Sequence, residues 1–167
     1  MTLRALEPND IDLLYQVEND PSLRSVSSAN VPYSRQLLSD YILNSTGDIY
    51  TDKQLRLIAE TDDGHTPVGI LDLSNFNPQH LRAEIGITIL PDYRQKGYAT
   101  QALRLLIDYA RTTLHLHQVY AVVPSGHEAS RHLFLSLGFT STAILTDWLQ
   151  LDDGSYDDAL IYQLIII

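Results

Sequence analysis

Residues 83–99 constrain the fold of this chain most strongly, because they join a buried strand to a long helix through a short basic loop. Isoleucines at every second position from 85 to 89 give the period of a strand, and their β-branched side chains favour that conformation. Pro91 ends the strand because a proline cannot donate to a ladder. The chain is therefore expected to fold around one strand–loop–helix unit.

The loop before the helix has the composition of an anion-binding turn. Gly97 lets the backbone come close to a ligand, and Ala99 keeps the first helical turn uncrowded. Free backbone N–H groups at such a turn, together with the positive end of the helix dipole, suit a pyrophosphate. Arg94 and Lys96 add positive charge. A solvated basic turn without a ligand is the alternative interpretation of the same residues.

Strands and helices are expected on both sides of this unit. Apolar residues spaced by three and four predict a helix over residues 97–113, and Ser125 with Glu128 has the capping-box spacing that starts another helix.

Further strands are expected at residues 2–6, 54–60, 68–73, 81–90 and 118–123 and after Phe139, with turns at 63–64, 75–78 and 152–154. A loop is expected at residues 22–32, a helix at 8–17, and another after Ser34 that buries Leu37, Leu38, Tyr41 and Ile42.

Arg94, Gly97 and Ala99 match the pattern Gln/Arg-x-x-Gly-x-Gly/Ala, and the second strand–helix unit ends in Leu-Gly-Phe at residues 137–139. With these residues the chain resembles the GNAT superfamily of acetyl-CoA-dependent N-acetyltransferases. An opening pattern of the form Leu-Arg-x-Leu…Asp makes it most similar to the spermidine and ribosomal-protein N-acetyltransferases. The resemblance implies one α/β (α+β) domain, residues 1–167, with a mixed, mostly antiparallel twisted sheet, flanking helices and splayed central strands.

The resemblance also implies where the two reaction partners bind. It places the co-substrate acetyl-CoA at Ile87, Thr88, Ile89, Arg94, Gln95, Lys96, Gly97, Tyr98, Ala99, Thr100, His127 and Ser130. It places the acceptor amine against the first two helices, with candidate contacts from Glu18, Asp20, Tyr33 and Tyr41. Surface acids and tyrosines at the edge of the core are the alternative interpretation of these four residues.

In acetyl transfer to an amine, a general base can contribute more to the rate than a general acid. An alkylammonium has a pKa of ~10.4, so its deprotonation at pH 7 costs about 4.6 kcal/mol. A thiolate with a pKa of ~8.5 lies only about 2 kcal/mol from its thiol at that pH. Glu84 is the candidate base, acting directly or through a water, and a solvent-facing acid on an edge strand is the alternative. Backbone N–H groups around Ile87 would hold the carbonyl oxygen.

The chain departs from the family at the second strand–helix unit. His127 stands where these families usually have an asparagine, and Phe134 stands where they have the tyrosine that serves as general acid. Three explanations are open: the thiolate leaves unaided or takes a proton from water, His127 or Tyr120 replaces the tyrosine, or the protein is a non-catalytic or weakly active acyl-CoA-binding sensor or interaction module. General acid catalysis contributes about 10²–10⁴-fold, so its loss would slow an enzyme without abolishing turnover.

Other polar clusters carry less information. His115 and His117 lack a third nearby ligand, so no metal site is predicted. The paired acids at residues 157–158 are expected in a turn or at a sheet edge, and the Trp148 side chain is expected to pack against other side chains.

The loop at residues 94–100 lacks the Gly-Lys-Ser/Thr ending of a P-loop and the triple glycine of a dinucleotide fold. Binding of another nucleotide by this loop is therefore the remote alternative.

Composition limits the partners and the compartment. The formal net charge of −10 argues against nucleic acid and favours a cationic acceptor, either a small-molecule amine or a protein amine. Neither a membrane span nor a signal peptide is expected, because no run of eighteen apolar residues and no N-terminal targeting pattern is present. The absence of cysteine fits a cytoplasmic protein. The apolar tail, residues 164–167, either finishes the last strand or covers a partner copy, which leaves a homodimer open.

Overall fold

The computed structural model describes residues 1–26 and 31–166. The elements follow one another in the order β1 (Thr2–Ala5), η1 (Pro8–Asp10), α1 (Ile11–Glu18), η2 (Pro21–Val26), α2 (Arg35–Asn44), α3 (Ile49–Asp52), β2 (Leu55–Glu60), β3 (Pro67–Asn77), β4 (Arg82–Ile89), η3 (Pro91–Tyr93), α4 (Tyr98–Thr112), β5 (Gln118–Pro124), α5 (Glu128–Ser136), β6 (Thr140–Gln150) and β7 (Tyr156–Ile165), where η marks a 3-10 helix. In the part of the chain that is described, no helix is long and apolar enough to cross a membrane.

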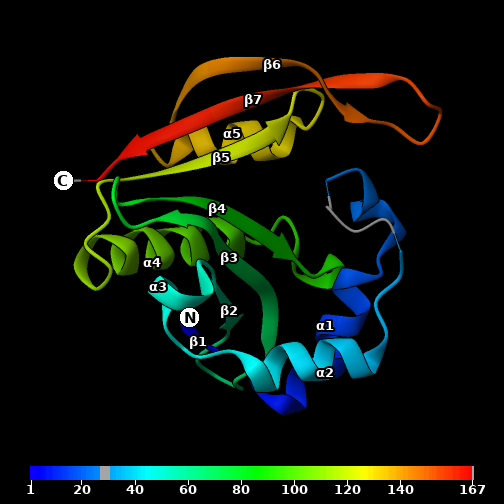
Figure 1. Ribbon diagram of the computed structural model, residues 1–167, viewed down its shortest axis with the longest axis vertical. Coiled ribbons are helices and arrows are strands. Elements are labelled where there is room, and N and C mark those ends of the chain that lie inside the picture. Colours follow the sequence, from blue (N-terminus) through cyan, green and yellow to red (C-terminus); the bar gives the residue numbers. More distant parts are fainter. Residues whose placement is uncertain (27–30, 167) are drawn as a thin grey trace.

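Seven strands form one sheet in the order β1-β2-β3-β4-β5-β7-β6. Neighbouring strands are antiparallel except β4 and β5, which run parallel. Helix α4 connects these two strands, because a parallel pair needs a long crossover and cannot be joined by a hairpin. The predicted fold, a mixed and mostly antiparallel sheet flanked by helices, is confirmed (Figure 1).

The two parallel strands pair over a short stretch and then separate. Their register covers three residue pairs and ends where Glu84 faces Tyr120. On its other side, β4 stays paired with β3 as far as Ile89. Within the described chain, residues 85–89 therefore have β3 on one side and no strand on the other, and this interval between β4 and β5 is named the strand opening. The splayed central strands that the resemblance implies are present.

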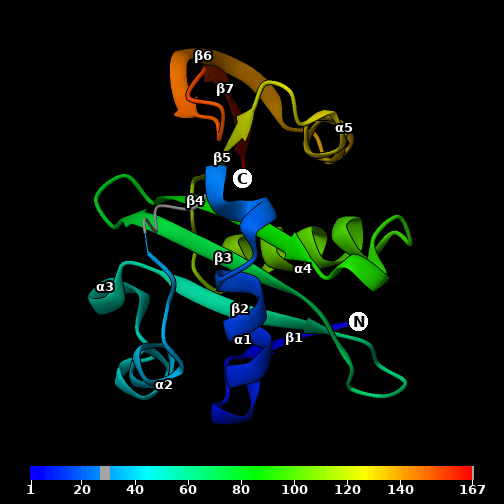
Figure 2. The ribbon, with the colours of Figure 1, turned by 90° about the vertical axis from the view of Figure 1, so that its right-hand side faces the viewer.

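Helices cover both faces of the sheet. Figure 2 shows α4 and α5 on one side and α2 and α3 on the other. The larger core lies between the sheet and α4 and α5, and it includes the four buried residues that α4 contributes with the predicted spacing: Ala102, Leu103, Leu106 and Ala110. A smaller core lies under α1 and α2 and joins Leu14, Leu38, Ile58 and Ile70. The two helical layers thus bury the two faces of the sheet separately.

The opening Leu-Arg…Asp pattern has a structural role. The guanidinium of Arg4 donates to Asp10 at 2.7 and 2.9 Å and to Glu60 at 2.7 Å. These bonds tie β1 to η1 and β2, and the hydrogen bond from Arg4 holds the pKa of Asp10 below its ordinary value. The pattern therefore fixes the N-terminal edge of the sheet.

Two predicted boundaries are wrong. The turn expected at residues 75–78 is the end of β3, which continues to Asn77 because Phe76 is buried against Tyr50, with ring centroids 5.0 Å apart. The loop expected at residues 22–32 begins with the 3-10 helix η2, and its residues 27–30 lie outside the described chain.

The predicted capping box is also wrong. The hydroxyl of Ser125 donates to Asp157 Oδ1 at 2.5 Å, so it does not cap the helix. Helix α5 begins later, and His127 is its N-cap. Asp157 and its neighbour Asp158 lie within β7, which has β5 and β6 as its neighbours, and not in a turn or on the edge strand of the sheet. Their carboxylates accept hydrogen bonds from the N–H groups of Gly126 and Asp147.

Two apolar side chains expected in the interior are exposed. Leu37 is 53% exposed, because the buried stripe of α2 runs through Leu38, Tyr41 and Ile42. Trp148 is 58% exposed, because β6 is the edge strand of the sheet. The C-terminal tail finishes the last strand and continues into the core, where the N–H of Ile166 donates to the carbonyl of His117.

Candidate active site

One large cavity of about 1120 Å³ lies on the face of the sheet that α1, α2 and α3 cover, and it is named the large cavity. Its floor includes Glu84, Gly86 and Thr88, which alternate along β4 with residues of the larger core. Its described acidic residues are Glu18, Asp20, Asp40, Asp52, Asp72 and Glu84. Arg56 is the one cation among the described residues that line it, so the cavity wall is strongly acidic.

Glu84 lies on a central strand and is half-buried, so its interpretation as an edge-strand acid is wrong. Its Oε2 accepts a hydrogen bond from Asn75 Nδ2 at 2.9 Å. Asn75 reaches it from an irregularity in β3 and has a φ of +51°, and bulges of this kind re-aim side chains next to functional sites. Tyr120 faces Glu84 in the register of β5, and burial together with the Glu84 charge raises the pKa of Tyr120. A carboxylate is thus held on the cavity floor beside a phenol.

Arg56 holds two carboxylates of the large cavity. Its Nε donates to Asp72 Oδ1 at 2.6 Å, and its Nη1 donates to Glu18 Oε1 at 2.5 Å. Its guanidinium carbon lies 5.8 Å from the centre of the Tyr41 ring. Burial lowers the pKa of Arg56, but the two carboxylates outweigh burial and raise it above its ordinary value. The residue therefore stays charged inside the cavity.

Sequence reasoning missed Arg56 and Asp72. They face each other on β2 and β3, on the same side of the sheet as Ile58 and Ile70 and opposite the strand residues of the larger core. The available signal was one charged residue within the apolar run of each strand, which resembles a solvated position until α1 and α2 are known to cover it.

The loop between η3 and α4 exposes a row of backbone N–H groups. Gln95 and Gly97 both have positive φ, +58° and +81°, and Gly97 precedes α4 without a side-chain cap. Within the described chain, the N–H groups of residues 95–100 donate to no protein acceptor. A Cβ added at Gly97 would meet only the side chain of Gln101, at 4.0 Å, so the space before the helix is open. These features fit a pyrophosphate.

The two cations of this loop face backbone carbonyls. Arg94 Nε donates to the Ile89 carbonyl at 3.0 Å, and Lys96 Nζ donates to the Asp92 carbonyl at 2.7 Å. Both side chains are exposed at the turn. Hydrogen bonds from Ser22 lower the pKa of Asp20, and the charge of Arg94 lowers it further.

The strand opening leaves backbone groups of β4 unpaired. The N–H of Leu90 donates to the Val68 carbonyl of β3 at 2.9 Å, and because antiparallel pairing alternates, the N–H of Thr88 also points to β3. The N–H groups of Ile87 and Ile89 therefore point into the strand opening. Since the register with β5 has already ended there, the N–H of Ile87 is available to a carbonyl oxygen.

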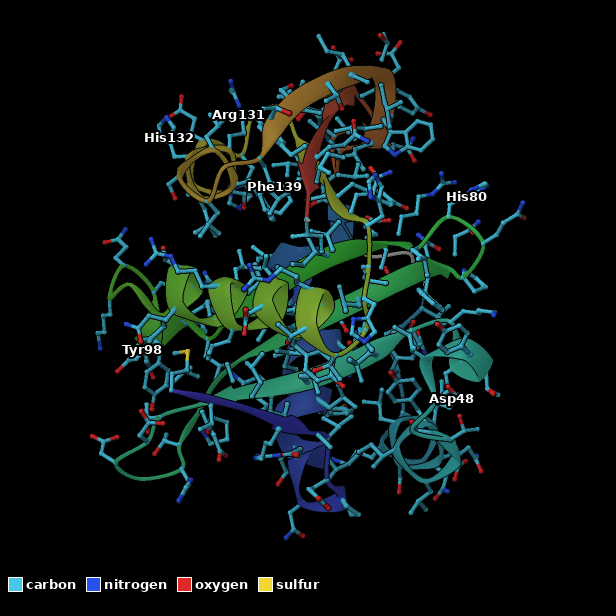
Figure 3. The ribbon with its side chains drawn as sticks, turned by 90° about the vertical axis from the view of Figure 1, so that its left-hand side faces the viewer. Asp48, His80, Tyr98, Arg131, His132 and Phe139 are labelled. Carbon is cyan, nitrogen blue, oxygen red and sulfur yellow. The ribbon has the colours of Figure 1, made fainter. Side chains whose placement is uncertain are left out.

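Helix α5 begins at the same edge of the sheet as α4. The parallel strands β4 and β5 end at a common edge, so the loops that follow them lie there together. The Nδ1 of His127 accepts a hydrogen bond from the N–H of Ser130 at 3.2 Å, which leaves Nε2 for another partner. Figure 3 shows Tyr98 at the first turn of α4 and His132 on α5, on the same side of the sheet.

The structure places the predicted residues in two groups. The proposed coenzyme residues follow the strand opening, the loop before α4 and the first turn of α5. The four candidate acceptor contacts all line the large cavity: Glu18, Asp20, Tyr33 and Tyr41. Among the described residues, no group of three His, Cys, Asp or Glu side chains is arranged to hold a metal ion.

Known proteins share this sequence pattern. A family described as "Acetyltransferase (GNAT) domain" matches residues 1–140. The spermidine N(1)-acetyltransferase of Escherichia coli (strain K12) is 33% identical over 139 residues, which cover 83% of this chain and 72% of the relative. The spermidine N(1)-acetyltransferase of Vibrio cholerae is 28% identical over 158 residues, which cover 95% of this chain and 88% of the relative.

Solved structures are similar over nearly the whole chain. The crystal structure of spermidine N-acetyltransferase from Vibrio cholerae in complex with CoA and spermine has a TM-score of 0.86 and 27% identity, and the match covers 98% of this chain and 94% of that chain. A dodecameric structure of spermidine N-acetyltransferase from the same organism has a TM-score of 0.82 and 28% identity, with 98% and 92% covered. Together with the free amides before α4 and the strand opening, these matches show that the chain belongs to the GNAT family and is an acetyl-CoA-dependent N-acetyltransferase.

Proposed function

We propose that the acceptor of this N-acetyltransferase is a polyamine, a flexible chain that carries several ammonium groups. The observation that carries the proposal is the large cavity, whose described ionisable wall has six carboxylates and one arginine that two of them already hold. Such a wall attracts a polycation, and a cleft with low-dielectric walls strengthens the attraction. Glu84 stands on the floor of this cavity, beside the strand opening.

Two of the relatives support a polyamine acceptor. The Escherichia coli relative is named for spermidine, and the Vibrio cholerae enzyme was solved with CoA and spermine. The candidate acceptor contacts of this chain line one cavity, which supports the same assignment.

The coenzyme is proposed to bind along the strand opening and the loop before α4. Acetyl-CoA supplies the acetyl thioester, and the free N–H groups of residues 95–100 would hold its pyrophosphate. Arg94 and Lys96 add positive charge once their side chains leave the carbonyls that they now contact. His127 and Ser130 would meet the coenzyme from the start of α5, and residues 87–89 would meet it from β4.

Glu84 is proposed as the base. It takes a proton from the substrate ammonium, directly or through a water, so that the amine nitrogen can bond to the thioester carbonyl carbon. The N–H of Ile87 donates to the carbonyl oxygen as negative charge develops there. Phe134 offers no proton to the departing sulfur when the C–S bond breaks, so water, Tyr120 or His127 supplies it.

A thiol-release assay with acetyl-CoA tests the acceptor. Spermidine and spermine are compared with an alkyl monoamine of similar length and with a peptide that has a free N-terminus. We expect kcat/KM for the polyamines to exceed that for the monoamine by about tenfold or more, because the extra ammonium groups pair with carboxylates. Equal values for monoamine and polyamine, or a preference for the peptide, would contradict the proposal. Acetyl-CoA binding without release on any amine would favour the sensor interpretation.

We also propose that the protein self-associates. The dodecameric Vibrio cholerae structure supports an assembly, and a homodimer is the smallest assembly possible. Light scattering at several concentrations measures the mass. The single domain over residues 1–167 and the cytoplasmic location stay predictions of the sequence.

A further inference from the structure

Gly86 occupies a position where a central strand normally carries a side chain. It lies in β4 between β3 and the strand opening, and it faces the large cavity together with Glu84 and Thr88. Its φ lies outside the positive range, so the backbone does not require glycine there. A glycine inside a strand weakens the strand and often marks a place where a ligand approaches the backbone closely.

The space above Gly86 is open. An added Cβ would meet only the Cβ of Asp72, at 3.7 Å, which is an ordinary contact. Asp72 is the residue that pairs with Gly86 on β3, and Arg56 pairs with Asp72 on β2. The row Arg56–Asp72–Gly86 therefore crosses the floor of the large cavity and ends at the strand opening.

Asp72 offers an acceptor along this row. Its Oδ1 accepts from Arg56 Nε at 2.6 Å, whereas its Oδ2 accepts no hydrogen bond from the described residues. Neighbouring strands lie about 4.8 Å apart, so Asp72 stands about one strand spacing from the backbone of Gly86.

We infer that Gly86 is a specificity-determining residue of this acetyltransferase. Because Gly86 has no side chain, it leaves a free path across the cavity floor, named the track, along which the acceptor chain lies. The reacting nitrogen lies at the strand opening beside Glu84, and the next ammonium lies on Asp72 Oδ2. The inference rests on the proposed polyamine acceptor and narrows it. The substrate is a linear amine with an unbranched spacer between its first two nitrogens.

Gly86→Ala and Gly86→Val test the track with three acceptors: 1,4-diaminobutane, butylamine and ethylamine. We expect kcat/KM for both four-carbon amines to fall by about 10-fold in the alanine variant and about 100-fold in the valine variant, because an added methyl or isopropyl group fills the track. The kcat/KM for ethylamine is expected to change less than threefold. The ethylamine chain is too short to cross Gly86, since crossing it takes about one strand spacing.

Asp72→Asn tests the second nitrogen. The asparagine keeps an amide oxygen for Arg56 Nε, so the row stays in place. The value for 1,4-diaminobutane is expected to fall by about tenfold, because an ammonium–carboxylate bond is lost. The value for butylamine is expected to fall less than the value for 1,4-diaminobutane, because butylamine has no second nitrogen.

Ala143→Val is the matched control, since it adds side-chain volume on the exposed edge strand β6 of the same sheet. Thermal unfolding and calorimetric titration with acetyl-CoA are measured for every variant. In the two Gly86 variants, neither the unfolding temperature nor the affinity for acetyl-CoA is expected to fall. Valine favours strands, and both substitutions reduce the conformational entropy of the unfolded chain.

Three results would overturn this inference and leave the proposed function standing. The first is a kcat/KM of the Gly86→Val variant with the diamine that equals the wild-type value. The second is an equal loss of kcat/KM for ethylamine and the diamine, and the third is loss of acetyl-CoA binding in both Gly86 variants. Gly86→Ala keeps the test decisive if the valine variant does not fold, because its Cβ makes only an ordinary contact. Failure of the wild-type protein to acetylate any polyamine overturns the proposed function, and this inference with it.

Discussion

The ring of Phe134 lies nearly parallel to the ring of Tyr162, with the planes 22° apart and the centroids separated by 6.3 Å. Phe139 meets Phe134 edge-on at 5.0 Å, and Phe134 is only 4% exposed. The position from which the family's tyrosine acts is therefore part of an apolar stack in this chain. The proton for the departing sulfur has to come from elsewhere.

Phe134→Tyr is expected to change kcat by less than about tenfold. A thiolate with a pKa of ~8.5 lies only about 2 kcal/mol from its thiol at pH 7, so it can leave without a protein acid. Thiol release at saturating acetyl-CoA measures the effect, and Phe139→Tyr controls for the about 1–3 kcal/mol cost of burying a hydroxyl. A gain of about 100-fold in the Phe134 variant alone would show that the wild type lacks an acid there.

Glu84→Gln is expected to lower kcat by about 10²–10⁴-fold at pH 7 and to leave acetyl-CoA affinity unchanged. The free fraction of an amine with a pKa of ~10.4 rises about tenfold per pH unit, so the defect should shrink between pH 7 and pH 10. A pH–rate profile measures this. Asn75→Ala keeps the carboxylate and removes only the 2.9 Å bond, so its loss should be smaller. A defect of constant size across the pH range would exclude Glu84 as the base.

Gly97→Ala is expected to weaken acetyl-CoA binding by about tenfold or more, because the added Cβ would stand where the pyrophosphate is proposed to approach the backbone. Gly154→Ala is the matched control, since Gly154 has almost the same φ, +84° against +81°, and lies in the exposed β6–β7 turn. Both variants should lose about 1 kcal/mol of unfolding free energy from the left-handed conformation. Calorimetric titration and urea unfolding separate the two effects. Equal coenzyme affinity in both variants would remove Gly97 from the site.

Arg56→Met is expected to lower the free energy of unfolding by about 2–3 kcal/mol, because it leaves two partly buried carboxylates without a cation. Arg35→Met is the control: Arg35 also lies over a tyrosine ring but pairs with Asp12 at the surface, which is worth less than about 1 kcal/mol. Urea unfolding measures both. A variant that also carries Glu18→Gln and Asp72→Asn should recover most of the loss. A loss that persists in this triple variant would assign the effect of Arg56 to packing.

The Arg4 ion pairs are expected to make stability fall in acid. Hydrogen bonds from Arg4 hold the pKa of Asp10 below its ordinary value of 3.8 and the pKa of Glu60 below 4.5. The unfolded chain therefore binds protons at a higher pH, so the contribution is complete above about pH 5 and is lost as the pH falls through the lower folded pKa values. Arg4→Met should cost stability at pH 7 and progressively less below about pH 4, measured by urea midpoints. A difference that does not change with pH would contradict this.

Local sequence patterns were sufficient to predict a helix or strand where one regular face of that element is buried. The spacing of apolar residues in α4 permits one buried face, and Gly97 ends the preceding loop with a conformation that other residues rarely adopt. The alternation over residues 85–89 likewise assigns β4. Boundaries failed where a distant contact decided them, as with Ser125, whose hydroxyl bonds Asp157 and so does not cap α5.

The sequence by itself determined the strand–loop–helix unit and the glycine turn before α4, because both follow from interactions between near neighbours in the chain. Only the tertiary structure decided the wall of the large cavity. Arg56 meets Glu18 and Asp72 across 38 and 16 residues of chain. Gly86 faces the large cavity because of a strand register that no local pattern specifies, since a shift by one residue would turn it to the other face.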